Sequence, residues 1–178
     1  MNDRVEVRRA RADDWLLARD TRLSALADSP EAFGSTLEDA ERRDEAFWRT
    51  WAEGSFIEGG AVMFLAFLEG ARPVGIVVGT RQDRGDDGER PDEVHLFSMW
   101  VAPEARRRGV GRHLLDAVEE WARTLHGVTD CVLCVTVGNE AAERLYAGAG
   151  FVPDGRVPLR QVRPGSALME RTMRRRLR

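Results

Sequence analysis

The stretch Arg106-Arg107-Arg108-Gly109-Val110-Gly111 lies between a predicted strand and a predicted helix. The strand spans residues 93–101 and is ended by Pro103, and the helix begins near Gly109. Apolar side chains recur along the helix at spacings of three and four residues and form one apolar face: Val110, Leu114, Val118, Trp121, Ala122 and Leu125. With a further strand at residues 131–137, the pattern predicts a strand–helix–strand unit in the second half of the chain.

The glycines allow the loop backbone to turn tightly and to approach a ligand closely. The first N–H groups of a helix are unpaired and lie at the positive end of its dipole, and three arginines stand beside them here. These features favour binding of a phosphate or pyrophosphate group. The alternative is a loop that only caps the helix.

Two common nucleotide-binding motifs are excluded by specific residues. The dinucleotide fingerprint needs a third glycine, but Leu114 occupies the position three after Gly111. The P-loop needs a Gly-Lys-Ser/Thr sequence, but all 27 basic residues of this chain are arginines. The loop therefore predicts a different phosphate-containing ligand.

Outside this unit, the same patterns predict further strands and helices. Strands are expected at residues 5–8, 61–68, 73–81, 151–152 and 167–173, and helices at residues 13–27, within 31–54 and at 139–148. Hairpins followed by the strand–helix–strand unit imply an α/β fold with a mixed, mostly antiparallel sheet of six to seven strands and helices on both faces. At 178 residues, the chain is expected to form a single domain over residues 1–178.

Composition and sequence pattern limit the expected binding partners and the expected cellular location of the protein. A net charge of −3 gives no reason to expect a nucleic-acid partner. The longest apolar run, residues 61–68, is far too short to span a bilayer, and the N-terminus shows no signal-peptide pattern, so we expect a cytoplasmic protein without membrane contact. The absence of lysine and the abundance of arginine, alanine and glycine indicate GC-rich coding, as in a high-GC bacterium.

Two cysteines, Cys131 and Cys134, have the C-x-x-C spacing but lie inside the predicted strand 131–137. Residues three apart on a strand point to opposite faces, so the two thiols can neither bridge nor share a metal ion there. Two buried free thiols and no metal site are expected.

The loop resembles the acetyl-CoA signature of the GNAT superfamily of N-acyltransferases. That signature reads Gln or Arg, two residues of any kind, Gly, any residue, and then Gly or Ala; Arg106, Gly109 and Gly111 match it. Further along, an asparagine after a strand, a helix with Leu145-Tyr146, and Gly150-Phe151 are similar to the second half of the family. The chain has one tyrosine and two asparagines, and Tyr146 and Asn139 fall where the family keeps these residue types.

The resemblance implies acetyl-CoA as cosubstrate and transfer of its acetyl group to a primary amine by direct attack. Backbone groups of Met99, Trp100 and Val101 would bind the pantetheine arm and the acetyl carbonyl. The pyrophosphate would lie on the loop and the start of the helix: Arg106, Arg107, Arg108, Gly109, Val110, Gly111 and Arg112. Asn139 would contact the pantetheine arm, and Tyr146 would face the sulfur.

Three residues are candidates for proton transfer. The phenol of Tyr146, with an ordinary pKa of ~10, is a reasonable acid for a leaving thiolate, although its ring could instead only pack on the sheet. His95 resembles a position where some protein-acetylating members carry a glutamate, and an imidazole of pKa ~6.5 suits proton acceptance at neutral pH. Glu93 is expected on the same strand face as His95. A packed histidine without a catalytic role, and proton removal through water, are the alternatives.

The sequence leaves the acceptor open. Small amines and peptide amines both fit, as do a monomer and a homodimer; a non-catalytic acyl-CoA-binding module and a peptide or protein N-terminal acetyltransferase are the alternative functions. An acidic cluster beside the strand favours a cationic acceptor, although Arg84 and Arg90 partly offset it. The cluster consists of Asp83, Asp86, Asp87, Glu89, Asp92 and Glu93.

Overall fold

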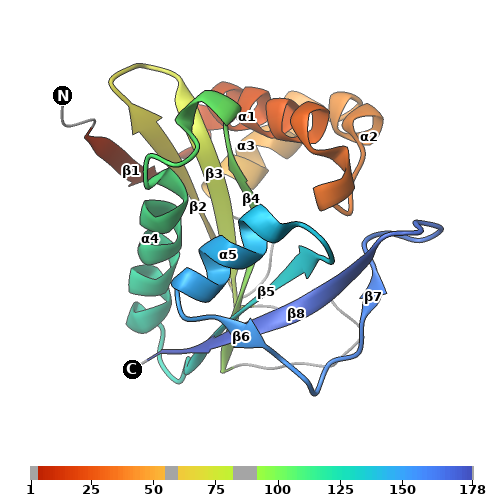
Figure 1. Ribbon diagram of the computed structural model, residues 1–178. Helices are drawn as coiled ribbons and strands as arrows, with labels where there is room; N and C mark the ends of the chain where they lie inside the picture. The colour runs from red at the N-terminus through yellow and green to blue at the C-terminus, as the bar shows by residue number, and fades with distance from the viewer. Residues whose placement is uncertain (1–3, 55–59, 82–91, 178) are drawn as a thin grey trace.

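The computed structural model describes residues 4–54, 60–81 and 92–177 (Figure 1). The strands are β1 (Val5–Arg9), β2 (Ala61–Leu68), β3 (Pro73–Thr80), β4 (Glu93–Val101), β5 (Asp130–Thr136), β6 (Val152–Pro153), β7 (Arg160–Gln161) and β8 (Met169–Arg176). The α-helices are α1 (Trp15–Asp28), α2 (Leu37–Glu41), α3 (Glu45–Glu53), α4 (Val110–Thr124) and α5 (Glu140–Gly148). Short 3-10 turns are η1 (Ala12–Asp14), η2 (Pro30–Ala32) and η3 (Pro103–Ala105).

The described strands form one eight-stranded sheet in the order β1-β2-β3-β4-β5-β8-β6, with β7 also paired to β8. The β4–β5 pairing is parallel, and the other pairings are antiparallel. The prediction of a mixed, mostly antiparallel sheet is confirmed. The sheet has one strand more than expected because β7 is only two residues long, too short for an alternating pattern to be recognised.

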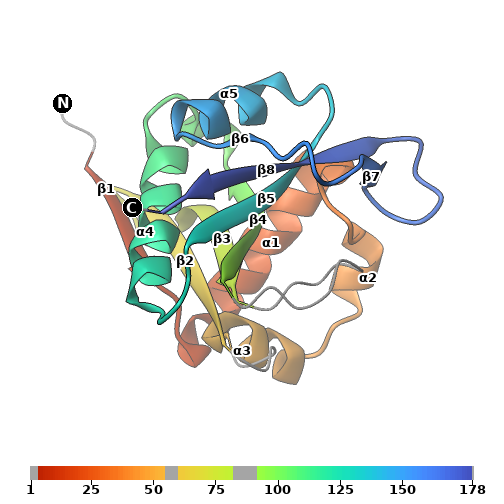
Figure 2. The same cartoon turned by 90° about the horizontal axis from the view of Figure 1, so that it is seen from below.

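Helices cover both faces of the sheet, as predicted. Figure 2 shows α4 and α5 on one side and α1, α2 and α3 on the other. The apolar face of α4 is buried against the first four strands. Two glycines of β3 allow this close approach: a Cβ on Gly75 would lie 2.9 Å from Cδ1 of Leu114, and one on Gly79 would lie 2.8 Å from Cγ1 of Val118.

A β-bulge interrupts β4 near its middle. Trp100 is opposite Ile76 and Phe97 is opposite Val78, so two residues of β4 face one residue of β3. Ser98, inside the bulge, has a left-handed backbone with φ 55°. Burial still alternates along β4: His95, Phe97 and Met99 are half-buried, and Leu96, Ser98 and Trp100 are buried.

The parallel pairing of β4 with β5 runs only from Glu93 opposite Asp130 to Leu96 opposite Leu133. Both strands continue, β4 to Val101 and β5 to Thr136, without ladder pairing to each other. The two central strands therefore separate just before the bulge. Backbone groups of β4 are left facing the gap.

Candidate functional site

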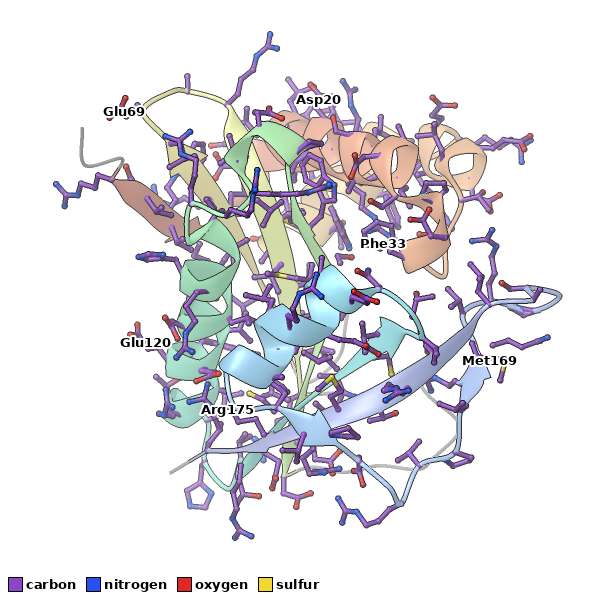
Figure 3. The ribbon with its side chains drawn as sticks, in the orientation of Figure 1. Asp20, Phe33, Glu69, Glu120, Met169 and Arg175 are labelled. Atoms are coloured by element: carbon purple, nitrogen blue, oxygen red, sulfur yellow. The ribbon has the colours of Figure 1, made fainter. Side chains whose placement is uncertain are left out.

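A cleft of about 640 Å³ opens where β4 and β5 separate. One wall consists of residues 95–99 of β4, residues 133–136 of β5, and the start and middle of α5. The other wall comes from the N-terminal helices and the loop after α1, including Arg22, Phe33, Ser35, Arg43, Phe47, Trp48 and Trp51. Figure 3 shows Phe33 on this loop, on the side toward α5. Segments far apart in the sequence thus meet at one site.

The loop between β4 and α4 contains two residues with left-handed backbone, Arg107 with φ 62° and Gly109 with φ 81°. Gly109 is the N-cap of the 15-residue helix α4, and no side chain in the described part of the chain caps this end. The first N–H groups of α4 therefore remain available, at the positive end of its dipole. Such a concave set of N–H groups suits an anion.

Asp28 at the end of α1 binds both the exposed Arg106 and the buried Trp100. Arg106 donates from Nε to the carbonyl oxygen of Val101 (3.0 Å) and from Nη2 to the carboxylate of Asp28. The same carboxylate accepts from Nε1 of Trp100 at 2.9 Å. These side chains join the end of β4 to α1, so any contact of Trp100 with a ligand is left to its backbone atoms.

Gly111 has a packing role that its place in the loop motif did not reveal. A Cβ there would lie 2.9 Å from Cδ2 of Leu145 and 3.5 Å from Cε of Met99. The missing side chain therefore lets the start of α4 approach α5 and β4 closely. Val110 is buried in the core, whereas Arg107, Arg108 and Arg112 are exposed.

Asn139 and Tyr146 both line the cleft. Asn139 is the N-cap of α5, and its Oδ1 accepts from the N–H of Ala142 at 3.2 Å. The Tyr146 ring is only 6% exposed and packs edge-on against Phe151, with ring centroids 6.1 Å apart. Burial raises the pKa of the phenol above its ordinary value of about 10, so the group stays protonated at neutral pH.

His95 lines the cleft, whereas Glu93 lies behind it. Nε2 of His95 is 3.3 Å from Oε2 of Glu93. The Glu93 side chain is 5% exposed and forms an ion pair with Nη2 of Arg174 at 2.6 Å. Arg174 also pairs with Asp154 at 2.8 Å. Glu93 therefore belongs to a buried charge network and reaches the cleft only through His95.

Sequence patterns missed several cleft residues that come from distant elements. Arg22 of α1 and Ser35 after η2 line the cleft, and so do Arg160 and Glu170 of the paired strands β7 and β8. None belongs to a recognisable motif. Only the fold brings them together, so residue spacing could not have identified them.

The aromatic residues of α3 both fill the core and line the cleft. Trp48 is 3% and Trp51 6% exposed, and the two rings pack edge-on.

The two cysteines point to opposite sides of β5 as predicted: Cys131 is in the hydrophobic core and Cys134 lines the cleft. Both are free thiols, but only Cys131 is buried as expected; Cys134 is half-buried because it faces the cleft.

Most of the acidic cluster expected beside the acetyl site, from Asp83 to Glu89, lies outside the described residues. Of the remaining two members, Asp92 is exposed and Glu93 is paired with Arg174.

None of the helices in the described ranges is long and apolar enough to cross a bilayer.

Known proteins of one family are similar to this chain in sequence and in fold. A family model described as "Acetyltransferase (GNAT) family" matches residues 22–151. The chloroplastic GCN5-related N-acetyltransferase 7 of Arabidopsis thaliana is 40% identical over 73 residues, which are 39% of this chain and 25% of that protein. An aminoglycoside N(6')-acetyltransferase type 1 of Klebsiella aerogenes is 30% identical over 131 residues, covering 62% of this chain and 85% of the relative.

Among solved structures, yncA of Salmonella typhimurium, determined with its cofactor acetyl-CoA, matches with a TM-score of 0.76 at 22% identity. The match covers 98% of this chain and 95% of that one. The chain spans less than two thirds of the length of several curated relatives that it matches. Since the family model matches well over half of the sequence and the fold agrees, the chain belongs to the acetyltransferase (GNAT) family.

Proposed function

We propose that this protein is an acetyl-CoA-dependent N-acetyltransferase that moves the acetyl group to a primary amine by direct attack. The observation that carries the proposal is the separation of β4 from β5 after Leu96 and Leu133, which opens a cleft beside the uncapped start of α4. The cosubstrate bound to yncA, which has the same fold, supports it.

The cosubstrate is held by backbone groups at two places. Its pyrophosphate binds the N–H groups of residues 107–112, where the helix dipole and exposed arginines favour negative charge. Its pantetheine arm lies along β4 and hydrogen-bonds to backbone groups of residues 99–101, in place of the strand partner that β5 no longer supplies. Asn139 contacts the arm from the other side of the gap.

The reaction needs two reactants held in contact and two proton transfers. The amine nitrogen attacks the thioester carbonyl, the new C–N bond forms, and the C–S bond breaks to release CoA. Backbone N–H groups near the β4 bulge stabilise the oxyanion that develops. The Tyr146 phenol, kept protonated by its raised pKa, donates to the departing sulfur.

His95 accepts the proton that the attacking amine loses. Its contact with Glu93 orients the imidazole and stabilises the positive charge that forms on it. Glu93 is thus a positioning residue, itself held by Arg174. The alternative proton acceptor is water. The pH profile of a His95 variant distinguishes proton removal by His95 from proton removal by water.

The test is an amine panel with acetyl-CoA, in which release of the CoA thiol is followed and the acetylated product is identified by mass. The panel includes aliphatic amines, aminoglycosides, amino acids and peptides with a free N-terminus. Acetyl-CoA should raise the melting temperature, and at least one amine should be acetylated well above the rate of thioester hydrolysis. Binding of acetyl-CoA without acetylation of any amine would instead support the non-catalytic acyl-CoA-binding module.

A further inference from the structure

Arg22 of α1 places a buried positive charge in the acceptor half of the cleft. The residue is only 8% exposed and lines the cleft. Its Nη2 donates to Oγ of Ser35 at 2.8 Å, and its guanidinium lies over the ring of Phe33, 4.4 Å from the centroid. Its buried Nη1 has no hydrogen-bond partner in the part of the chain that the structure describes.

The other buried charges in the described residues differ from Arg22 because each has a counter-charge. Glu119 pairs with Arg175, and Asp154 pairs with Arg174 and Arg156. Burial lowers the pKa of Arg22 to about 10, which reflects the unfavourable transfer of its charge out of water. A buried guanidinium without an anion is destabilising, and a ligand that supplies the anion removes that penalty.

The groups around Arg22 are held in place by contacts with other elements. Oγ1 of Thr136 donates to the carbonyl oxygen of Glu31 at 3.2 Å, which ties η2 to β5. Nη1 of Arg163 donates to the carbonyl oxygen of Phe33 at 3.2 Å. The loop that carries Phe33 and Ser35 is therefore fixed before any ligand binds, and a fixed site loses little entropy on binding.

The charges that line the cleft leave a positive excess. Glu170 is paired with Arg160 at 2.7 Å, and Asp39 lies 3.7 Å from Arg42. Arg43 lies over the Phe47 ring, and no acidic partner is found for it among the described residues. Among the described residues, this balance favours an anionic group on the acceptor, and Glu93 adds no free negative charge because it is neutralised by Arg174.

Resting on the proposed function, we infer that the acceptor is a small amine that carries a carboxylate, and that Arg22 binds this carboxylate. One carboxylate oxygen accepts from Nη1 of Arg22, and the hydroxyl of Ser35 donates to the other. A single buried guanidinium matches the single charge of a carboxylate, whereas a phosphate dianion needs a second buried cation, and Arg43 is exposed. Amino acids and other amino-carboxylic acids have this chemistry.

Matched acceptors test the inference. The proteinogenic L-amino acids are compared with their carboxamides and with their decarboxylated amines, using wild type, Arg22→Gln, Arg22→Lys and the control Arg144→Gln. Arg144 is an exposed arginine of α5 that does not line the cleft and pairs with the exposed Glu140. Folding is checked by thermal melting. Both kcat/KM for each amine and KM for acetyl-CoA are measured.

We expect the preferred acid to exceed its carboxamide in kcat/KM by a factor of about 10 to 100, the range of a charge-assisted hydrogen bond. Arg22→Gln should remove this preference by raising KM for the acid. It should leave kcat/KM for the carboxamide and KM for acetyl-CoA unchanged. Arg22→Lys should restore part of the preference for the acid. Arg144→Gln should behave as wild type. A merely structural Arg22 would instead lower the rates with acid and carboxamide equally.

Carboxamides or decarboxylated amines that react as fast as the acids would overturn the inference and leave the proposed function standing. If no amine of any class is acetylated, the proposed function fails. Binding then decides the inference separately: amino acids must raise the melting temperature more than their carboxamides do, and Arg22→Gln must abolish that difference. Equal stabilisation by acids and carboxamides would overturn it.

Discussion

Leu96 of β4 and Leu133 of β5 are the last residues at which these two parallel strands pair. The bulge with Ser98 follows at once in β4 and turns the remaining strand away. The gap is flanked by the start of α4 on one side and by Asn139 and Tyr146 on the other. One local irregularity of a central strand thus creates the space for a ligand.

Replacement of Gly109 tests the anion site. The backbone has φ 81°, which asparagine and aspartate tolerate better than other side chains, and a Cβ there comes no closer than 3.7 Å to His113. Gly109→Asp places a negative charge at the proposed pyrophosphate site, and Gly109→Asn is its neutral isostere. We expect Gly109→Asp to bind acetyl-CoA at least tenfold more weakly than Gly109→Asn, measured by calorimetry. Equal affinities of the two folded variants for acetyl-CoA would show that its phosphates do not bind at this loop.

Tyr146→Phe separates chemistry from binding. The ring remains to pack on Phe151, so the variant should fold and bind acetyl-CoA normally. Loss of the phenol proton should lower kcat by about 10²-fold, the lower end of the range for general acid catalysis. Steady-state kinetics and calorimetry check this. A variant with full kcat would return Tyr146 to a packing role.

The raised pKa of Tyr146 also predicts a pH effect on stability. Burial disfavours the phenolate, so the folded-state pKa lies above the unfolded value of about 10. The contribution of the protonated phenol to stability is complete below that value and is lost as the pH rises above it. Tyr146→Phe, which cannot ionise, should lose less melting temperature than wild type between pH 9 and about 11. Parallel alkaline losses in the two proteins would contradict this.

His95→Ala tests the proposed base. If the imidazole accepts the amine proton, the wild-type rate with a preferred amine falls on the acidic side of the profile, and the variant loses that limb along with most of its activity. Glu93→Gln should lower kcat less, because it removes only the group that orients His95. A His95→Ala profile with an unchanged acidic limb would assign proton removal to water.

Asp154 predicts acid sensitivity of the fold. Its carboxylate accepts from Nε of Arg156 at 3.0 Å and from Nε of Arg174 at 2.8 Å, and these bonds hold its pKa far below the usual range. A lowered pKa contributes stability above the unfolded value of about 4, and this contribution is lost as the pH falls below it.

Asp154→Asn should therefore lower the free energy of unfolding at pH 7 by about 1–3 kcal/mol and flatten the acid limb of melting temperature against pH. Asp20→Asn is the control, because Asp20 forms an exposed pair with Arg19. An Asp154→Asn protein with wild-type acid sensitivity would show that other carboxylates govern the acid limb.

Local patterns were sufficient for much of this protein. The apolar face of α4, the glycine loop before it, the N-cap at Asn139 and the opposed cysteines of β5 all depend on residues close in sequence, where helix and strand periods fix which side chains share a face. The same local order was enough to predict a mixed sheet covered on both faces. The bulge at Ser98 was not predictable, because no glycine or proline marks it and its shape depends on pairing with β3.

The acceptor half of the cleft was decided only by the tertiary structure. Arg22 and Ser35 are 13 residues apart, and the loop between them is tied to Thr136, 105 residues beyond Glu31. The sequence made Glu93 a second candidate for proton transfer, whereas in the fold its carboxylate is paired with Arg174. Periodicity specifies which face of an element is buried, but whether a charge meets a counter-charge depends on which elements the completed sheet brings together. For that physical reason the sequence alone indicated the loop that is proposed to hold the acetyl donor, and the packing of distant segments determined which residues lie opposite that loop.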